Sequence, residues 1–396
     1  MKPSICLTFK IHQPTNLRLY RFFEIGKDSH YYDDFANRSM IKKTAADCYL
    51  PMNQLILDLI KSTKGKLKVA FAISGGTLDL FDRYCPEVLD SFRDLNATGC
   101  VEFLCEPYYH SFAAVADDAE FAHQVNKHRN AIKEYIGADV KTFVNTDMVY
   151  TDAIGEKIAD LGFKTVITEG AKHVLGWKSP NYVYSCVYNP KLKLLLRNPG
   201  LSDDISIRFS DRSWAAWPLS AESYYSWLEQ ARGEQVVNLC MNYKAFGEFH
   251  KKESGIFEFF AALVNMVVSK DCFIFATPSE VAKKYAAVDS IDVQDPVSCE
   301  NEEKDMSKWL GNDLQKEAFN KLYALQEKLA IANLPQLWED YGLLQESDHF
   351  FNMNSRFFTD NGNHRYVNPY DTPFEAFINY MNVLADFAIR VDEELN

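Results

Sequence analysis

The stretch "VEFLCEPYYHSF", residues 101–112, places two carboxylates, a thiol, two tyrosines and a histidine within one short run. Residues 101–105 alternate in side-chain character in the manner of a β-strand. The apolar pattern stops at Glu106, and the following Pro107 prevents a simple continuation of the strand. The strand therefore delivers an ionisable carboxylate, surrounded by aromatic residues, to the point where it ends.

Polar residues and glycines also follow the other strand-like runs. In a parallel βα barrel the carboxyl ends of all strands open on one face, where the connecting loops build the active site. We therefore expect these residues to converge at one mouth, although a single one, such as Asp147, could instead cap a helix. The residues are His12, Gly75, Gly76, Asp79, Glu106, Asp147, Glu169, Gly170, Asp203, Asp204 and the segment 242–248.

The chemistry that such a mouth could perform is narrowed by the motifs that the chain lacks. The sequence contains no G-x-S-x-G elbow, no Walker A loop and no glycine-rich dinucleotide turn. His12, His110 and the pair Asp203–Asp204 could bind a metal ion, but no H-x-x-x-H pair at helical spacing supports one. Once these motifs are excluded, the remaining candidates for catalysis are the carboxylates at the strand ends. Two carboxyl groups on either side of a sugar are the minimum that a glycosidase needs.

Strand-like and helix-like segments alternate along most of the chain. This alternation predicts βα units and a mainly parallel sheet, and their number favours a barrel over an open sheet. The expected strands are residues 5–11, 66–74, 100–106, 141–146, 163–169, 192–198, 235–241 and 272–278, the last being a possible edge or closing strand. The clearest helical patterns between them cover residues 119–137, 153–163 and 221–234.

The composition changes after residue 285, where the chain becomes acidic and loses its apolar period. We expect a barrel domain at 1–285, a linker at 286–308 and a C-terminal helical domain at 309–396 that contributes to the rim of the active site. The helical periodicity of residues 313–333, 335–353 and 373–395 supports a helical bundle packed on the barrel.

Charge and cysteine content exclude several classes of partner. The 396 residues carry a formal net charge of −13, which argues against a nucleic-acid partner and against an anionic membrane surface. Nine cysteines are scattered singly without a C-x-x-C pair, so we expect a reducing compartment and no disulfide framework. The N-terminal apolar run is too short for a signal peptide, and no stretch approaches membrane-spanning length. A cytoplasmic protein is expected.

Several stretches together resemble glycoside hydrolase family 57, in its α-amylase branch. "KIHQP" (10–14) resembles the first motif of the family and "ISGGTLDLFD" (73–82) the second. "VEFLCEPYYHSF" resembles the third, which implies that Glu106 is the catalytic nucleophile. "LLLRNPGLSDDISIRFS" (194–210) resembles the fourth, which implies that Asp204 is the general acid/base, with Asp203 as its neighbour.

The fifth motif of the family is matched by "LLQESDHFFNM" (343–353), where Asp348 corresponds to a sugar-contacting aspartate. The resemblance implies a (β/α)7 barrel, an α-1,4-glucan such as starch or glycogen as substrate, and retaining chemistry without a metal ion or other cofactor. In that chemistry Glu106 attacks the anomeric carbon while a protonated Asp204 donates to the leaving oxygen, so the pKa of Asp204 must be raised.

Six further residues are expected to bind substrate: His12, Asp79, Tyr108, His110, Asp203 and Asp348. Each has a structural alternative. Glu106 could pair with an arginine, Asp204 could cap a helix or turn, and His12 could be a core histidine bonded to backbone. Asp79 and Asp348 fit ligand contact and ion pairing about equally well. The sequence indicates no oligomeric state.

The chain departs from the family pattern in two places, and these departures keep other functions open. Asn242, Lys244 and Phe249 stand where the branch usually has aspartate, glutamate and histidine, and Val144 stands where it has arginine. Residues that support a catalytic group set its orientation and its pKa, so replacing them can change the activity of the site. The alternatives are a 4-α-glucanotransferase with the same residues, a glucan-binding homologue with impaired catalysis and a metal-dependent polysaccharide deacetylase-like hydrolase using His12, His110 and Asp203.

Overall fold

The computed structural model describes residues 2–300, 302–332, 334–356 and 368–395. Seven parallel strands form a closed ring, as the sequence predicts. β1 pairs with β2 and β8, β2 pairs with β3, and a bridge from Cys105 to Phe143 joins the end of β3 to β4. β4 pairs with β5, β5 with β7, and β7 with β8. The strands are β1 (Ser4–Ile11), β2 (Val69–Ile73), β3 (Val101–Phe103), β4 (Phe143–Val144), β5 (Thr165–Glu169), β7 (Lys193–Arg197) and β8 (Val236–Asn242).

Three short strands lie outside this ring. β9 (Ile274–Phe275) pairs with the first residues of β1, so the run predicted at 272–278 does not close the barrel. β6 (Val183–Cys186) runs antiparallel to the first half of β7, which meets β8 only at Arg197. β10 (Ser290–Ile291) pairs with β6. β6 is absent from the predicted strands, since four residues between turns carry no readable period.

Side chains that point into the barrel are apolar at its centre and charged at its carboxyl end. Successive residues of a strand face opposite sides, so every second residue points inward. Along β3 and its extension, the outward Phe103 packs under the helices, whereas Leu104 belongs to the interior cluster. The central interior residues include Cys6, Ala70, Ala72, Leu104, Val144, Ile167, Leu195 and Cys240. One step further along the strands, the same direction carries Lys10, Glu106, Glu169 and Arg197 to the mouth.

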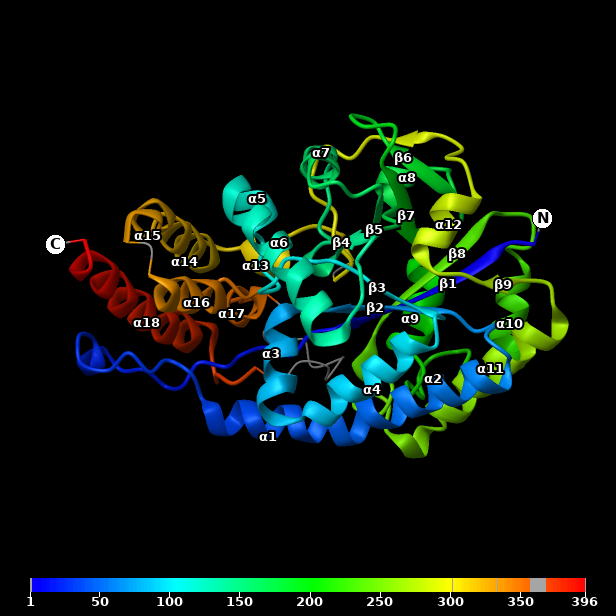
Figure 1. Cartoon of the computed structure of the whole chain (residues 1–396), viewed down its shortest axis with the longest axis horizontal. Helices are drawn as coiled ribbons and strands as arrows, with labels where there is room; N and C mark the ends of the chain where they lie inside the picture. Colours follow the sequence, from blue (N-terminus) through cyan, green and yellow to red (C-terminus); the bar gives the residue numbers. More distant parts are fainter. Residues whose placement is uncertain (1, 301, 333, 357–367, 396) are drawn as a thin grey trace.

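Helices surround the barrel, and the connections follow the predicted βα rhythm (Figure 1). The expected helices at 119–137, 153–163 and 221–234 are present as α6, α7 and α10. The helices of this part are α1 (Asp34–Thr44), α2 (Leu50–Ser62), α3 (Gly75–Tyr84), α4 (Pro86–Ala97), α5 (Ala113–Ala116), α6 (Asp118–Ile136), α7 (Asp152–Asp160), α8 (Lys172–Leu175), α9 (Pro199–Ser206), α10 (Ala221–Glu229), α11 (Ile256–Lys270) and α12 (Pro278–Lys284).

The C-terminal helices gather beside the end of the barrel towards which β1 runs (Figure 1). They are α13 (Ser307–Leu310), α14 (Asp313–Tyr323), α15 (Gln326–Ala332), α16 (Pro335–Leu344), α17 (Ser347–Asn352) and α18 (Pro373–Glu393). One apolar cluster joins them to the barrel layer; for example, the rings of Phe112 and Trp309 lie 5.0 Å apart. The division at 286–308 stays a prediction, and the linker pairs with the barrel through β10 and a bridge from Val297 to Tyr150.

The helix expected over 335–353 is broken between α16 and α17. The break has a tertiary cause, because Glu346 accepts hydrogen bonds from the backbone and hydroxyl of Thr15 at 2.7 and 3.0 Å. The backbone N–H of Ser347 donates to the carbonyl of His110 at 3.1 Å. These bonds replace helical ones and turn the start of α17 towards the mouth of the barrel. No helix in the described ranges combines the length and apolarity needed to cross a membrane.

Candidate active site

Glu106 lies at the carboxyl end of β3 and is 3% exposed. Its carboxylate oxygen Oε2 accepts a hydrogen bond from Nδ1 of His110 at 3.0 Å. Its backbone N–H donates to Nδ1 of His128 at 3.4 Å, and Nε2 of His128 donates to the carbonyl of Ile73 at 2.7 Å. Burial lowers the pKa of His128, so this ring is neutral and holds the Glu106 backbone in place. The carboxylate therefore sits on a fixed backbone at the mouth.

His110 connects Glu106 to a second buried carboxylate. Its Nε2 lies 3.7 Å from Oδ1 of Asp147, and both side chains are at most 12% exposed. Burial alone lowers the pKa of His110, but the hydrogen bonds and charges of Asp147 and Glu106 outweigh it and raise the pKa to about 10. His110 is thus a cation at neutral pH. Its positive φ of 52° makes the tight turn that aims the ring between the two acids.

A lysine from the first strand completes this chain of charges. Nζ of Lys10 lies 2.7 Å from Oδ1 of Asp147. Burial opposes ionisation of both groups, yet the charge of Lys10 and the hydrogen bond from His110 lower the pKa of Asp147. Asp147 likewise raises the pKa of Lys10 against the effect of burial. Asp147 does not cap the next helix, because Thr151 holds that position. The two buried charges stabilise each other only as a pair.

His12 and Asp348 form a second contact beside His110. The rings of His12 and His110 stack with centroids 3.9 Å apart. Nε2 of His12 donates to Asp348 at 2.7 Å, and Nδ1 accepts from the hydroxyl of Ser74 at 2.8 Å. Burial and the charge of His110 lower the pKa of His12, so the ring is neutral with its proton on Nε2. Although burial opposes it, the His12 contact and the charge of His110 lower the pKa of Asp348 to about 2.

A third group of charges lies at the ends of β5 and β7. The Arg197 guanidinium contacts Glu169 at 3.2 Å and also pairs with Asp203, and Lys304 lies 3.8 Å from Glu169. Burial raises the pKa of Glu169, and the charges of Arg197 and Lys304 oppose that rise. The second oxygen of Glu169, Oε1, is buried and has no hydrogen-bond partner in the described part of the chain. A buried acceptor without a partner can receive a ligand hydroxyl.

Asp204 points differently from its neighbour Asp203. Its carboxylate pairs with Arg208, one helical turn further on, at 2.6 Å. It lines a shallow cavity of about 370 Å³ together with Asn181, Asn198 and Glu234. Burial raises the pKa of Asp204 and the charge of Asp203 adds to the rise, while the ion pair with Arg208 opposes it. Asp203 therefore belongs to the charged group around Arg197 and Glu169 at the ends of β5 and β7. Asp204 lies outside that group and has the elevated pKa.

Asp79 and Tyr108 meet each other in a separate group. The hydroxyl of Tyr108 lies 2.8 Å from both carboxylate oxygens of Asp79, and Tyr135 donates to the same carboxylate at 3.0 Å. The Lys127 ammonium lies over the ring of Tyr108, 4.1 Å from its centroid. A Cβ at Gly75 would lie 2.3 Å from this ring, so the close approach requires glycine there. Through these bonds α3 and α6 are tied to the loop after Glu106.

The departures from the family pattern lie outside these bonded groups. Val144 is buried in the central interior of the barrel, among small apolar side chains. Asn242 is exposed at the end of β8, and its side chain accepts from the backbone N–H of Lys244 at 3.0 Å. Phe249 packs against the main apolar cluster. Val144, Asn242 and Phe249 thus have local structural roles in this chain.

In the part of the chain that the structure describes, two groups of side chains bring possible metal ligands together, and these groups already have protein partners. His12, Glu346 and Asp348 bring donor atoms within 4.8 Å of one another, as do Asp147, Cys299 and Glu300. In the first group His12 bonds Asp348 and Glu346 bonds Thr15. In the second group Lys10 already supplies a positive charge to Asp147. Protein contacts therefore satisfy both groups, and the expectation of a site without metal stays a prediction.

The structure places six of the eight site residues predicted from the sequence in or beside the charged groups at the carboxyl end of the barrel. Glu106, His110, His12 and Asp348 form one connected set, and Asp203 enters through Arg197. Asp204 lies beside Asp203 on α9. Asp147 and Glu169 were expected at the mouth without an assigned role, and Lys10, Arg197 and Lys304 were not expected there. The first four were readable as charged residues at or near strand ends, whereas Lys304 enters from the predicted linker and carries no such signal.

The fold and the site together define a parallel βα barrel whose acids lie at the carboxyl ends of its strands. The model of "Glycosyl hydrolase family 57" matches residues 6–294. A Methanocaldococcus jannaschii protein whose provisional name is α-amylase is 36% identical over 407 residues, which cover 99% of this chain and 85% of that protein. The chain belongs to glycosyl hydrolase family 57, and the protein is a glycoside hydrolase.

Solved structures with low identity share the fold. The branching enzyme of Thermococcus kodakaraensis is 11% identical with a TM-score of 0.68, covering 89% of this chain and 86% of that one. The α-amylase of Thermotoga maritima is 12% identical with a TM-score of 0.62, covering 99% and 96%. The 4-α-glucanotransferase of Thermococcus litoralis is 14% identical with a TM-score of 0.64; the match covers 88% of this chain and only 56% of that one. The predicted (β/α)7 architecture is confirmed.

Proposed function

We propose that the protein cleaves α-1,4-glucosidic bonds of starch, glycogen or maltooligosaccharides by double displacement, with Glu106 as the nucleophile. The observation that carries the proposal is the buried position of Glu106 at the end of β3, where it bonds His110, which also contacts Asp147. A nucleophile needs a fixed orientation and exclusion of bulk water, and both are provided there. The names of the relatives, an amylase, a branching enzyme and a glucanotransferase, supply the substrate class.

In the first step Glu106 attacks the anomeric carbon while an aspartic acid protonates the departing glycosidic oxygen. Water activated by the same aspartate then releases the glycosyl-enzyme. His110 holds Glu106 through Oε2, and we propose that the neutral His12 and the ionised Asp348 bond sugar hydroxyls. We add Glu169 to the residues that bind substrate, because its Oε1 has no hydrogen-bond partner among the described residues and can accept a bond from a sugar hydroxyl.

The acid/base comes from the pair Asp203–Asp204, and the two residues satisfy different requirements. Asp204, the residue that the sequence favours, has the raised pKa that a proton donor needs. Asp203 is the one that Arg197 joins to Glu169 at the mouth. Position comes before pKa in choosing a general acid, so Asp203 deserves an equal test. The variants Asp203→Asn and Asp204→Asn, each assayed with substrates of good and poor leaving groups, separate the two roles. The variant that lacks the true acid/base should lose kcat/KM on the poor leaving group and largely keep it on the good one, because kcat/KM reports only the first step.

Hydrolysis and transfer use the same residues and differ in the molecule that accepts the glycosyl group from the enzyme in the second step. Water gives hydrolysis, and a sugar hydroxyl gives a 4-α-glucanotransferase. Incubation with starch and with maltoheptaose, followed by product profiling, distinguishes them because only transfer yields chains longer than the substrate. We propose hydrolysis as the main outcome. Full activity in EDTA is expected for a reaction without a metal ion, and its loss would favour the deacetylase-like alternative.

A protein that only binds glucans is the remaining alternative, motivated by Asn242, Lys244 and Phe249. Such a protein would bind maltoheptaose yet release no product at high protein concentration. Asn242 lies beside Lys10 in the sheet, but none of the three side chains bonds Glu106 or His110 among the described residues, so we expect turnover. We also propose a cytoplasmic location, supported by nine free cysteines of which seven are buried. The net charge of −13 supports a site for neutral sugars, with neither nucleic acid nor a membrane as partner.

A further inference from the structure

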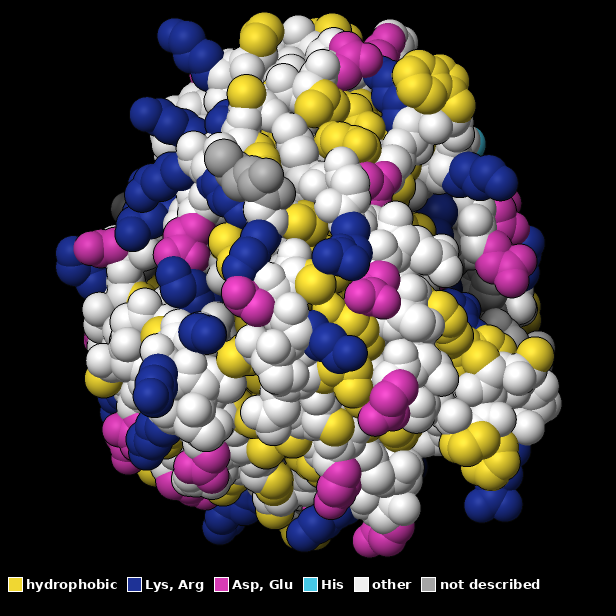
Figure 2. Space-filling view, turned by 90° about the vertical axis from the view of Figure 1, so that its right-hand side faces the viewer, with side chains coloured by type: hydrophobic (Ala, Val, Ile, Leu, Met, Phe, Trp, Pro, Cys, Tyr) yellow, Lys and Arg dark blue, Asp and Glu magenta, His cyan; other side chains and the backbone are white. Residues whose placement is uncertain are grey.

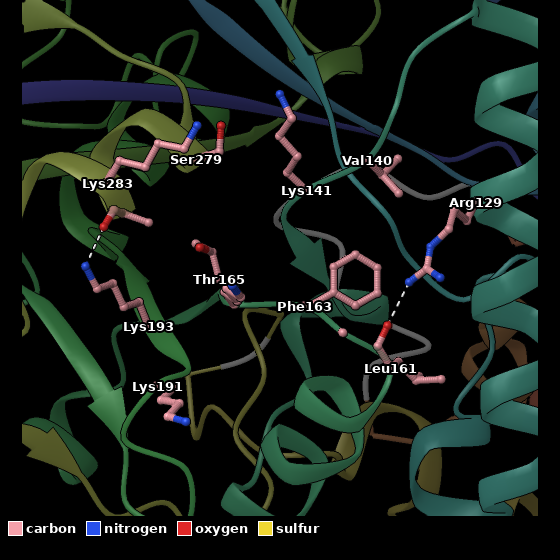
Figure 3. A pocket seen from close by; sticks show the side chains of 13 residues that line it. Arg129, Val140, Lys141, Leu161, Phe163, Thr165, Lys191, Lys193, Ser279 and Lys283 are labelled. Atoms are coloured by element: carbon pink, nitrogen blue, oxygen red, sulfur yellow. Dashed lines mark hydrogen bonds between the residues drawn. The ribbon is translucent and has the colours of Figure 1, made fainter.

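A second cavity lies at the opposite end of the barrel, where the strands begin. It has a volume of about 580 Å³, within the range of small-molecule sites. The residues around it come from α6, α12 and the segments that lead into β4, β5 and β7 (Figure 3). Glu106 does not line it, so the cavity is separate from the candidate active site.

The charge of this cavity is of one sign. Six of its lining residues are cationic and none is acidic: Arg129, Lys141, Lys164, Lys191, Lys193 and Lys283. This composition is unusual in a chain whose net charge is −13. Figure 2 views the end face of the molecule on this side and shows Lys and Arg side chains crowded along its left half.

The cations of the cavity have no carboxylate partners within ion-pair distance among the residues that the structure describes. Two of them are instead held by neutral backbone oxygens. Lys193 donates to the carbonyls of Ala282 and Tyr285, and Arg129 donates to the carbonyl of Leu161 at 2.9 Å (Figure 3). These bonds fix the position of each charge and do not neutralise it. Glu102, which contacts the lining, is already bonded to the hydroxyl of Thr142 and the backbone of Ser279. Glu280 feels the charge of Lys283 and is paired with Lys68 outside the lining.

The cavity also has an apolar wall and two hydroxyl groups. Phe163, Val140 and Leu161 form the apolar side, and the hydroxyls of Thr165 and Ser279 lie among the lysines (Figure 3). Like charges gathered in a concave site repel one another and focus a positive potential into it. A ligand that carries several negative charges on compact oxygens would relieve this repulsion, and Lys and Arg are the usual partners of phosphate.

We propose that this cavity binds a small molecule bearing phosphate groups. The lysines bond the phosphate oxygens, and the wall at Phe163 receives the organic part when the ligand is an ester. Free phosphate or pyrophosphate and an organic phosphate share the charged part, and only the ester uses the wall. The proposal concerns binding at the amino end of the barrel and does not depend on the reaction assigned to Glu106.

Isothermal titration calorimetry at low salt tests the proposal on the full chain. The probes are pyrophosphate, ATP and glucose 1-phosphate, and the variant is Lys164→Gln with Lys283→Gln. Both lysines are exposed, so the fold is retained. We expect the variant to weaken pyrophosphate binding about tenfold or more, because two charge-assisted contacts are lost. Tighter binding of ATP or glucose 1-phosphate than of the inorganic probe would identify an ester as the ligand, and equal binding would identify the inorganic ion.

The control is a double variant with the same loss of charge elsewhere, Lys252→Gln with Lys316→Gln, at two exposed lysines that do not line the cavity. The proposal is overturned if the control weakens binding as much as the cavity variant does. Absence of binding at about 10 mM of every probe also overturns it. A second measurement needs no variant: pyrophosphate should protect Lys164 and Lys283 from acetylation and leave Lys252 and Lys316 reactive.

Discussion

At the carboxyl end of the barrel, Lys10, His110 and Arg197 each contact a carboxylate, whereas the six cations at the amino end contact none that the structure describes. At the mouth, the charged side chains are buried and of both signs. At the opposite end most of the lysines are exposed and of one sign. The same barrel thus carries a charge-balanced site at one end and a charge-unbalanced cavity at the other.

The difference shows what each end can do without a ligand. The paired charges of the mouth hold their positions at the cost of desolvation, which suits groups that must be oriented before a neutral sugar arrives. The cations of the cavity repel one another until an anion binds, so their charge is available to a ligand. Residues that look alike in the sequence should therefore respond differently to substitution at the two ends.

The largest effect is expected for Glu106→Gln. The amide cannot attack the anomeric carbon, so kcat should fall by about ten-thousandfold or more while glucan binding stays close to that of the wild type. The matched control is Glu102→Gln, on the same strand and pointing into the barrel near its amino end, where Glu102 bonds Thr142 and Ser279. The control should lose about 1–3 kcal/mol of stability and keep its kcat. Comparable activity of the two variants would remove Glu106 from the mechanism.

A second contrast compares two lysines. Lys10→Met leaves Asp147 buried without its closest cation and should lower the free energy of unfolding by about 3–5 kcal/mol. Lys164→Met, at the cavity, removes an exposed lysine without a described carboxylate partner and should change stability by less than about 0.5 kcal/mol. Urea unfolding measures both. Equal effects would mean that the two ends do not differ in the way their charges are balanced.

The charge of His110 predicts a pH dependence of stability. Its pKa rises from 6.5 to about 10 on folding because the bonds to Asp147 and Glu106 outweigh burial. The stabilisation is therefore fully present below pH 6.5 and is lost as the pH rises through about 10. His110→Gln should be less stable at pH 6 and should flatten this part of the curve, as urea midpoints across the range will show. A wild-type curve without a decline on the alkaline side contradicts a protonated His110.

The smallest effect concerns Tyr108. Tyr108→Phe removes the bonds to Asp79, while Tyr135 keeps its own, so the loss of stability should be about 1 kcal/mol. If the pair binds substrate, as the sequence predicts, KM for maltoheptaose should rise as well. An unchanged KM with the same loss of stability would limit Asp79 and Tyr108 to holding α3 and α6 together.

Much of the barrel could be predicted because its signals are local. The runs around Ser4–Ile11 and Val236–Asn242 are apolar and bounded, so the strands could be recognised from the sequence. β6 could not be predicted, since its four residues owe their conformation to pairing with β7. The break between α16 and α17 could not be predicted either, because the hydrogen bond from Thr15 to Glu346 joins positions far apart in the sequence.

The sequence predicted many of the residues that form the site but few of the contacts between them. A carboxylate at the end of a strand is visible in the sequence, as Glu106 was. The pairing of Lys10 with Asp147, and the separate directions of Asp203 and Asp204, depend on which side of the barrel or helix each side chain takes. The cavity at the amino end gave no sequence signal either, because its six cations come from five separate segments of the chain.

The central claim, that Glu106 forms the glycosyl ester, can be tested by trapping that ester. A maltosyl fluoride fluorinated at C5 of the reacting ring slows hydrolysis of the intermediate more than its formation. Peptide mapping by mass spectrometry then locates the label. We predict one maltosyl ester per chain, on Glu106 in the peptide that contains residues 101–112. A label on another carboxylate, or a first-formed product of inverted anomeric configuration, would contradict the account.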